Sequence, residues 1–286
     1  MTTGPEAIPA VVATAKANPG IWFIGVDQAP CLSPAGALDP KGVCAGNIAK
    51  ILPRYMAITY AEDQAGYLAG IVAASATRSG VIGAIGGTST CGPCVKYIQG
   101  YILGAKSVMQ TARVKTGFVS VDDVRLGFSD QLAGNTYATT FIKANAGLDV
   151  LFQVADRTDV GGLTGDGIID AACAAGIDVI GVDVDQHQAY PASQACILTS
   201  AEKSVSASVS DSIAAIAAMT AVGGLTTYNA ANDGISISPF YAAADKLRAG
   251  TDARIAAALD GMKSGSLVTC PPSPQCGKTP APKLGD

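Results

Sequence analysis

The sequence predicts an α/β protein in which parallel sheets are flanked by helices. Strand-like and helix-like segments alternate along almost the whole chain, which is typical of parallel sheets covered on both faces. Two apolar strand-like stretches, far apart in the sequence, end on aspartates: Ile21 to Asp27 and Ile177 to Asp185. Because ligands of open α/β sheets bind at the carboxyl ends of strands, we expect two lobes facing one cleft.

The predicted strands are short runs of β-branched and aromatic residues. They lie at residues 21–26, 55–60, 81–85, 115–120, 149–154 and 178–182. The segments between them are rich in Ala, Leu and Lys, with apolar residues at helical spacing. The segment 64–78 is the clearest, because Tyr67, Leu68 and Ile71 share one stripe and Gly80 follows as a stop signal.

Composition narrows the class of protein. The chain has 286 residues, of which 49% are hydrophobic and 15% charged, enough for two domains with substantial cores. The net charge of −4, without a basic block, argues against nucleic acid as the main partner. No apolar run reaches the roughly 18 residues of a membrane span. No secretory signal pattern follows Met1.

Eight cysteines are consistent with disulfides and an oxidising compartment, and free thiols in a cytosolic protein are the alternative. The possible disulfide cysteines are Cys31 and Cys44, Cys91 and Cys94, Cys270 and Cys276, which form close pairs, and the remaining Cys173 and Cys196.

The motif Cys91-Gly92-Pro93-Cys94 also permits a redox function. In thioredoxins such a motif lies at a helix N-terminus, which lowers the pKa of the first thiol, and we expect a helix to begin near Pro93. Thr90 stands where thioredoxins have Trp. A structural disulfide and two plain thiols therefore stand beside catalysis as interpretations of this motif.

Asp27 and Asp183 are the candidate ligand contacts that the residues themselves indicate. A carboxylate at a strand end accepts hydrogen bonds from vicinal hydroxyls, which suits a sugar or nucleoside. The alternative is that each aspartate caps the next helix or turn. Lys203, expected in the first turn of a helix capped by Ser200, opposes the helix dipole. It therefore contacts a polar or anionic ligand, faces an aspartate, or is solvated.

We expect no cofactor and no metal. The chain has a single histidine, His187, which is expected in a solvated loop, so metal clusters and His-based triads are disfavoured. The glycines of 80–87 do not form the G-x-G-x-x-G pattern of dinucleotide-binding loops.

Taken in order, several stretches resemble the basic membrane lipoprotein family, the PnrA-like nucleoside-binding proteins of ABC transporters. The stretches are Asn18 to Asp27, Gln64 to Ala74, Gly83 to Gly87, Pro93 to Ala105 with Gly100-Tyr101 and Gly104-Ala105, Leu148 to Phe152, Ile180 to Gln186, and Ile197 to Ser200 with Lys203. The resemblance runs nearly from end to end, and the order and spacing of the stretches make it specific.

The resemblance implies a two-lobed fold like that of type I periplasmic binding proteins, and no enzymatic activity. It implies an extracytoplasmic solute-binding protein that captures a nucleoside-like ligand and hands it to ABC permease subunits. The ligand contacts that we expect on this basis are Asp27, Gln28, Asp156, Thr158, Gly162, Asp183 and Lys203. The aspartates would hold ribose hydroxyls or base edges. Lys203 would orient a carboxylate or bind the ligand directly.

The resemblance also sets the expected domain boundaries. Lobe one comprises residues 1–110 and 199–223, lobe two comprises 111–198 and 224–269, and 270–286 form an irregular Pro-rich tail. We expect the chain to lack the first βαβα unit of lobe one, together with the signal peptide and the lipidated cysteine that would anchor the full-length protein to the membrane. Asp156 and Arg157 replace the Gly and Thr typical of the family loop, which puts a purine preference in doubt.

Two other functions fit the sequence. One is a thiol-disulfide oxidoreductase that uses Cys91 and Cys94. The other is a ligand-sensing domain on the same fold, which the lack of any DNA-binding or signalling segment in this sequence disfavours.

Overall fold

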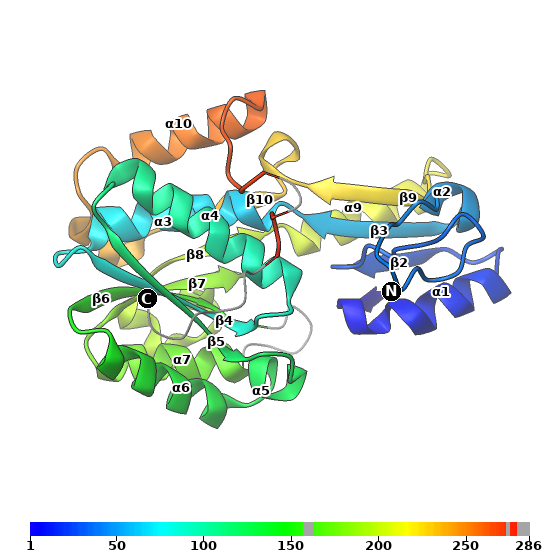
Figure 1. The fold of residues 1–286 in the computed structure, drawn as a ribbon. Coiled ribbons are helices and arrows are strands. Elements are labelled where there is room, and N and C mark those ends of the chain that lie inside the picture. The colour runs from blue at the N-terminus through cyan, green and yellow to red at the C-terminus, as the bar shows by residue number, and fades with distance from the viewer. Residues whose placement is uncertain (157–162, 273–274, 279–286) are drawn as a thin grey trace. The chain divides into compact units, whose positions relative to one another are not determined.

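The computed structural model describes residues 1–156, 163–272 and 275–278, and it divides into two compact units. Unit 1 comprises Met1–Ala61 and Ser204–Gly234, and unit 2 comprises Glu62–Lys203 and Ile235–Asp286. Each unit has its own sheet and helices (Figure 1). Among the described residues, none of the helices has the length and apolar character needed to span a membrane.

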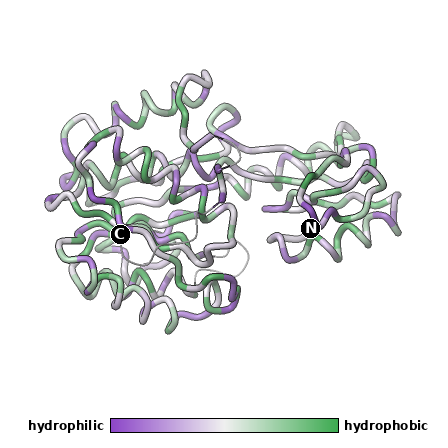
Figure 2. Tube along the Cα trace, viewed as in Figure 1, coloured by the Kyte–Doolittle hydropathy of each residue, from purple (hydrophilic) through white to green (hydrophobic). Residues whose placement is uncertain are grey.

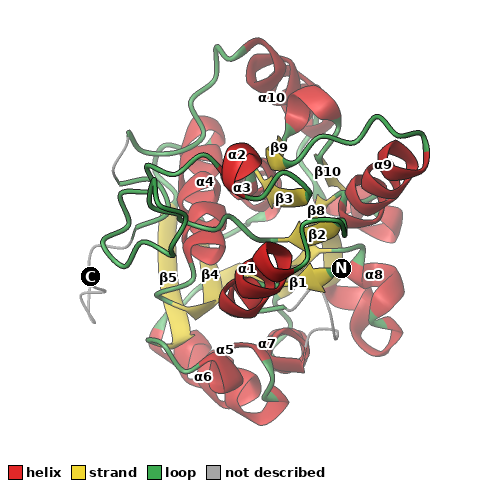
Figure 3. Ribbon diagram, turned by 90° about the vertical axis from the view of Figure 1, so that its right-hand side faces the viewer, coloured by secondary structure: helices red, strands yellow, loops and turns green. Residues whose placement is uncertain are grey.

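Unit 1 is built on a parallel four-stranded sheet in the order β1-β2-β3-β9. The strands are β1 (Thr2–Thr3), β2 (Phe23–Val26), β3 (Tyr55–Tyr60) and β9 (Gly224–Tyr228). Successive side chains of a strand point to opposite faces, so each face receives its own helix. Helix α1 (Ile8–Ala17) packs against Tyr55 and Ala57, and α9 (Val205–Ala217) packs against Ile58 and Tyr60 (Figure 3). The short helices are α2 (Ile48–Ile51), η1 (Pro5–Ala7) and η3 (Ala230–Asn232).

Unit 2 has a six-stranded sheet in the order β10-β8-β7-β6-β4-β5. Its parallel strands are β4 (Val81–Thr88), β5 (Arg113–Ser120), β6 (Leu148–Val154), β7 (Asp178–Asp183) and β8 (Ile197–Lys203), and β10 (Ile235–Ile237) is an antiparallel edge strand. Every residue of β4 and β7 is buried. Strands that are buried along their whole length are typical of a parallel sheet covered on both faces.

Helices cover both faces of this sheet. Helices α3 (Glu62–Ala76) and α4 (Gly92–Val108) lie on one face, and α5 (Val124–Phe128), α6 (Gln131–Ala144) and α7 (Leu163–Ala174) lie on the other (Figure 1). Helix α10 (Thr251–Ser264) packs on α3. The short elements are α8 (Gln186–Ala189), η2 (Pro191–Cys196) and η4 (Tyr241–Lys246). Hydrophobic stretches recur in the strands and helices of both units (Figure 2).

Glycines let α3 and α4 approach each other backbone to backbone. A Cβ added at Gly66 of α3 would lie 2.1 Å from the carbonyl oxygen of Tyr97, and one at Gly100 of α4 would lie 1.9 Å from that of Asp63. Gly70 and Gly104 repeat these contacts one turn further along the two helices. This packing fixes the register of α3 against α4, and thereby the positions of the side chains at the N-terminal ends of both helices.

The six predicted strands are all present, with ends that differ by up to three residues. The division into units differs from the expected lobes. Residues 62–110 belong to unit 2, because β4 pairs with both β5 and β6 in the larger sheet. Residues 224–234 belong to unit 1, because β9 pairs with β3. Sequence periodicity does not specify these long-range pairings.

All eight cysteines form disulfides, and the three close pairs of the sequence are among them. The bonds join Cys31 to Cys44, Cys91 to Cys94, Cys173 to Cys196 and Cys270 to Cys276. The described part of the expected tail has no helix or strand, but its backbone is bonded to α4 through Gln99.

Candidate functional site

Polar side chains gather at the carboxyl edge of the sheet in unit 2. Strand β7 ends at Asp183, the neighbouring β8 ends at Lys203, and Asp156 follows β6 by two residues. Parallel strands share this edge, where ligands of open α/β sheets bind. Asp183 and Lys203, each 7% exposed, are buried charges of opposite sign.

Asp183 and Lys203 form the centre of a buried ionic cluster. The Lys203 Nζ lies 3.5 Å from Asp183 Oδ1 and 3.9 Å from Glu62 Oε1. Tyr97 of α4 donates its hydroxyl to Asp183 Oδ1 over 3.1 Å. Glu62, the first residue of α3, is 2% exposed, and its Oε2 lies 3.3 Å from Lys96 Nζ. Removing one partner from such a buried set leaves an uncompensated charge, which is strongly destabilising.

The charges of this cluster compensate one another. Asp183 and Glu62 supply two carboxylates, and Lys203 and Lys96 supply two ammonium groups. Lys203 also lies 5.6 Å from the centre of the Tyr97 ring, within the range of a cation–π contact. Among the residues that the structure describes, the cluster therefore offers hydrogen-bonding groups of both signs with balanced charges.

A second polar network lies beside the first and joins the ends of β6, β7 and β8. Gln186, the first residue of α8, accepts from Val182 N over 3.0 Å and donates from its backbone N to Ser200 Oγ over 3.0 Å. The amides of Gln153 and Gln186 both donate to Asp156 Oδ2.

Burial raises the pKa of the Asp156 carboxyl well above its usual range, and the charges of Asp183 and Asp166 add to this rise. Its Oδ1 atom is buried and accepts no hydrogen bond from the residues that the structure describes. The raised pKa favours the protonated carboxyl, which carries an O–H donor beside its acceptor oxygen.

The same turn ends β7 and β2 and presents an aspartate in both units. Asp183 has φ +67° and Asp27 has φ +54°, the left-handed region that Asp adopts more readily than most residues. In each case a glutamine folds back over a glycine of the strand. A Cβ at Gly181 would lie 2.5 Å from Gln186 Oε1, and one at Gly25 would lie 2.3 Å from Gln28 Oε1.

The structure places the predicted site residues in different surroundings. Asp183, Lys203 and Asp156 come together at the edge of the sheet in unit 2. Asp27 is half-buried at the end of β2 in unit 1. Gln28 is fully buried, and its amide bonds to Gly4 O, Thr2 Oγ1 and the Tyr55 hydroxyl. These bonds tie Gln28 to the core of unit 1, and its contact with ligand stays a prediction. Thr158 and Gly162 lie outside the described residues.

Two local expectations for the site also need correction. Lys203 is the last residue of β8 and not part of a helical first turn, because α9 begins at Val205; Ser200 lies within the strand. The expectation that it faces an aspartate is met by Asp183. His187 is not a simple solvated loop residue, since its ring stacks on Tyr241 with centroids 3.8 Å apart.

Four residues of the site did not emerge from the sequence as site residues: Glu62, Lys96, Tyr97 and Gln186. Glu62 lies two residues after the end of a strand, which is a weak signal for an edge residue. Tyr97 was recognisable only as part of a helical stripe. Among the residues that the structure describes, no group of His, Cys, Asp and Glu is placed to hold a metal ion.

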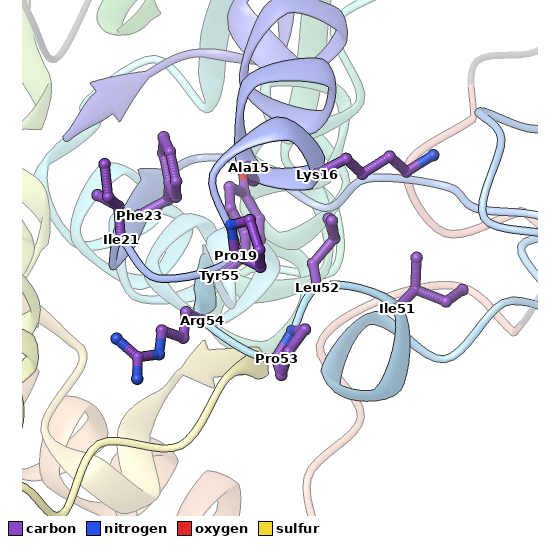
Figure 4. Close-up of a pocket in the computed structure, with 10 residues that line it drawn as sticks. All are labelled: Ala15, Lys16, Pro19, Ile21, Phe23, Ile51, Leu52, Pro53, Arg54 and Tyr55. Atoms are coloured by element: carbon purple, nitrogen blue, oxygen red, sulfur yellow. The ribbon is translucent and has the colours of Figure 1, made fainter.

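Unit 1 contains a small apolar cavity of about 120 Å³ at the amino ends of its strands (Figure 4). Its walls are Ala15, Lys16, Pro19, Ile21, Phe23, Ile51, Leu52, Pro53, Arg54 and Tyr55. Lys16 and Arg54 donate to the backbone oxygens of Gly36 and Gly20. Phe23 begins β2 and Asp27 follows its end, so this cavity does not include the predicted ligand residue.

Comparison with known proteins identifies the family. A sequence model described as Bmp, ABC transporter substrate-binding protein PnrA-like, matches residues 2–256. The chain belongs to this family. The resemblance seen in the sequence is thereby confirmed.

Curated PnrA-like relatives align with part of the chain. The "ABC transporter nucleoside-binding protein BmpA" of Lactococcus lactis subsp. cremoris is 30% identical over 177 residues, which cover 58% of this chain and 46% of that protein. Basic membrane protein D of Borreliella burgdorferi is 30% identical over 147 residues, which cover 51% and 38%. The aligned part of the chain thus spans less than half the length of these relatives.

Solved structures agree with the fold. An ABC transporter solute-binding protein from Aeropyrum pernix superposes with a TM-score of 0.69 at 18% identity, covering 94% of this chain and 76% of that one. A solute-binding protein from Conexibacter woesei gives 0.63 at 22% identity, with 93% and 84% covered. At these identities the likeness concerns the fold alone, and it confirms the predicted α/β, type I periplasmic-binding-protein-like class.

Proposed function

We propose that the protein acts as an extracytoplasmic solute-binding protein of an ABC importer and captures a nucleoside-like molecule. The observation that carries this proposal is the buried Asp183–Lys203 pair at the carboxyl edge of the unit 2 sheet. Membership of the substrate-binding family supports it, as does the nucleoside-binding description of the Lactococcus lactis relative. ABC permease subunits are the proposed partners, and a lipid anchor is the proposed link to the membrane.

The chemistry of the cluster supports a neutral, hydroxyl-rich ligand. A carboxylate such as Asp183 has two oxygens, so it suits the vicinal hydroxyls of a ribose. Lys203 supplies a donor, and the buried Oδ1 atom of Asp156, which has no hydrogen-bond partner among the described residues, is available to a base edge. Because the two carboxylates and two lysines balance each other among the described residues, a phosphate group would add a charge to this buried set. Nucleosides should therefore bind better than the corresponding nucleotides.

Asp27 remains a proposed ligand contact on its own grounds. It ends β2 in the same left-handed turn as Asp183, and a strand end of this kind presents a carboxylate at the ligand edge of a parallel sheet.

Isothermal titration calorimetry of the protein against inosine, guanosine, adenosine, cytidine and uridine tests the proposal. We expect saturable heat with at least one nucleoside. The matching 2′-deoxynucleoside should bind at least about tenfold more weakly, because it lacks a hydroxyl that can donate to Asp183. The 5′-monophosphate should also bind at least about tenfold more weakly, because it adds a negative charge near Asp183. Absence of heat with every nucleoside would refute the ligand assignment.

The Cys91–Cys94 disulfide supports a second candidate function, thiol-disulfide exchange. It closes the first turn of α4, and Cys91 Sγ accepts from Cys94 N over 3.2 Å. A helix N-terminus favours a thiolate at this position. Cys94, however, is only 5% exposed.

A further inference from the structure

The C-terminal residues beyond the family match bond to the two helices that carry Glu62 and Tyr97. We call residues 269–272 and 275–278 the C-terminal clasp. Its first residue, Thr269, is 6% exposed and donates to Asp63 Oδ2 in the first turn of α3. The family model ends at residue 256, so the clasp lies outside the part of the chain that defines the family.

Gln99 of α4 holds the other end of the clasp with three hydrogen bonds. Its Nε2 donates to Gln275 O over 3.0 Å and to Lys278 O over 3.2 Å. Its Oε1 accepts from Gly277 N over 2.8 Å. One side-chain amide thus bonds to three backbone groups of a segment that is neither helix nor strand. Backbone N–H and C=O groups need hydrogen-bond partners where they are shielded from water.

A disulfide makes the clasp a closed ring. Cys270 and Cys276 are bonded, so the contact at Thr269 and the contacts at Gln99 are joined by a short covalent loop. Closing a loop restricts the conformations that the segment can adopt when it is not docked. The ring therefore favours simultaneous contact with α3 and α4.

The clasp contacts lie next to residues of the ionic cluster. Asp63 follows Glu62 directly, and Gln99 lies three residues after Lys96, on the same face of α4. Gly277, at φ +75°, packs against the aliphatic stem of Lys96: a Cβ there would lie 3.3 Å from Lys96 Cγ. The Lys96 ammonium reaches Glu62, which in turn faces Lys203.

We propose that the C-terminal clasp is a positioning device for the ligand site, with Gln99 as its central positioning residue. The clasp fixes the N-terminal ends of α3 and α4 and so holds Lys96, Glu62 and Tyr97 in place around Asp183 and Lys203. Its effect on ligand affinity rests on the proposed function, whereas its effect on the two helix ends does not.

Hydrogen exchange of the ligand-free protein tests the positioning directly. In Gln99→Ala, we expect the amides of the first turns of α3 and α4 to exchange about tenfold faster, because these turns lose their external restraint. The matched control is Gln110→Ala, an exposed glutamine just beyond the other end of α4. Unchanged exchange in Gln99→Ala would overturn the proposal.

Combining the Gln99 substitution with loss of the Cys270–Cys276 disulfide shows whether Gln99 acts through the clasp or independently of it. The double variant Cys270→Ser/Cys276→Ser should increase the exchange rates of the same amides. Adding Gln99→Ala to it should raise these rates no further than the more severe of the two changes does alone, because both changes act through the clasp. Full additivity would overturn the proposal. If Gln99→Ala fails to fold, the exchange rates of the disulfide variant alone test the proposal.

Titration with the best-bound nucleoside of the panel distinguishes this proposal from the ligand assignment. We expect Gln99→Ala to bind about fivefold more weakly while its thermal midpoint stays within about 3 °C of the wild type. Equal affinity would overturn the link between clasp and site. If no nucleoside binds the wild type but exchange changes as predicted, the clasp stands and the ligand assignment fails.

Discussion

Tyr97 donates its hydroxyl to Oδ1 of Asp183 over 3.1 Å, joining α4 to the end of β7. This bond connects a helix that covers the sheet with the carboxylate proposed to bind ligand. Its geometry depends on the close packing of α3 and α4, which in turn depends on glycines at the contact between these helices.

Tyr97→Phe should weaken both the fold and ligand binding. Asp183 loses one donor in a buried environment, so we expect a loss of about 1–2 kcal/mol in the free energy of unfolding, measured by urea denaturation. The control is Tyr101→Phe on the same helix. Its hydroxyl is buried and has no hydrogen-bond partner among the residues that the structure describes, so its removal should be neutral or stabilising. Equal losses in the two variants would contradict the role of Tyr97.

Gly100→Ala should be strongly destabilising. The added Cβ would lie 1.9 Å from the backbone oxygen of Asp63, so α3 and α4 would have to move apart. We expect a loss of about 3 kcal/mol or more in the free energy of unfolding. Gly20→Ala, which meets no atom within 4 Å, should change stability by less than about 1 kcal/mol. A tolerated Gly100→Ala would show that this contact is adjustable.

Asp166 should make the fold less stable as the pH rises from about 4 to 6. Burial, and then the charge of Asp170, raises the pKa of Asp166 to about 6. The unfolded chain releases this proton near pH 4, so between these values the folded state binds more protons and its stability falls with rising pH. The raised pKa of Asp156 likewise lowers the stability of the fold as the pH rises.

Asp166→Asn should flatten this pH dependence. Because Asp166 is partly exposed, we expect a gain of about 1 kcal/mol at pH 7 and little change at pH 4. Urea denaturation of both proteins at pH 4, 5, 6 and 7 measures the difference. Parallel stability curves for wild type and variant would contradict the raised pKa.

Cys91→Ser should behave like the wild type in an insulin-reduction assay, with neither protein exceeding the background rate of the dithiol reductant. The buried position of Cys94 hinders attack on that sulfur, and the rate of thiol exchange depends on access. Activity in the wild type that Cys91→Ser abolishes would favour the oxidoreductase function instead.

The strands and Asp183 could be predicted from the sequence because their signals are local. The β-branched run from Ile177 ends on carboxylates, and a buried strand with that pattern places Asp183 at a sheet edge whatever its neighbours are. The sequence predicts Lys203 as a site residue but leaves its element open, since Thr199 to Lys203 resembles a helix cap as much as a strand end. The structure resolves this ambiguity by pairing β8 with β7.

The rest of the site depends on contacts between distant segments. Glu62 becomes a site residue only because α3 packs on α4 and faces β8. The boundary of the units depends on β4 pairing with β6, 60 or more residues along the chain. Gln28 follows Asp27 in the sequence, but its hydrogen bond from Tyr55, 27 residues along the chain, has no local signal. Local patterns in a single sequence carry no information about such pairings.

Asp183→Asn tests the central claim most directly. The substitution keeps the shape of the side chain but removes its charge, so a charge-assisted bond to ligand hydroxyls becomes a neutral one. We expect calorimetric titration with the best-bound nucleoside to show an affinity loss of about 10- to 100-fold, whereas Asp122→Asn, at an exposed position of the same unit, binds like the wild type. Wild-type affinity in a folded Asp183→Asn protein would contradict the account.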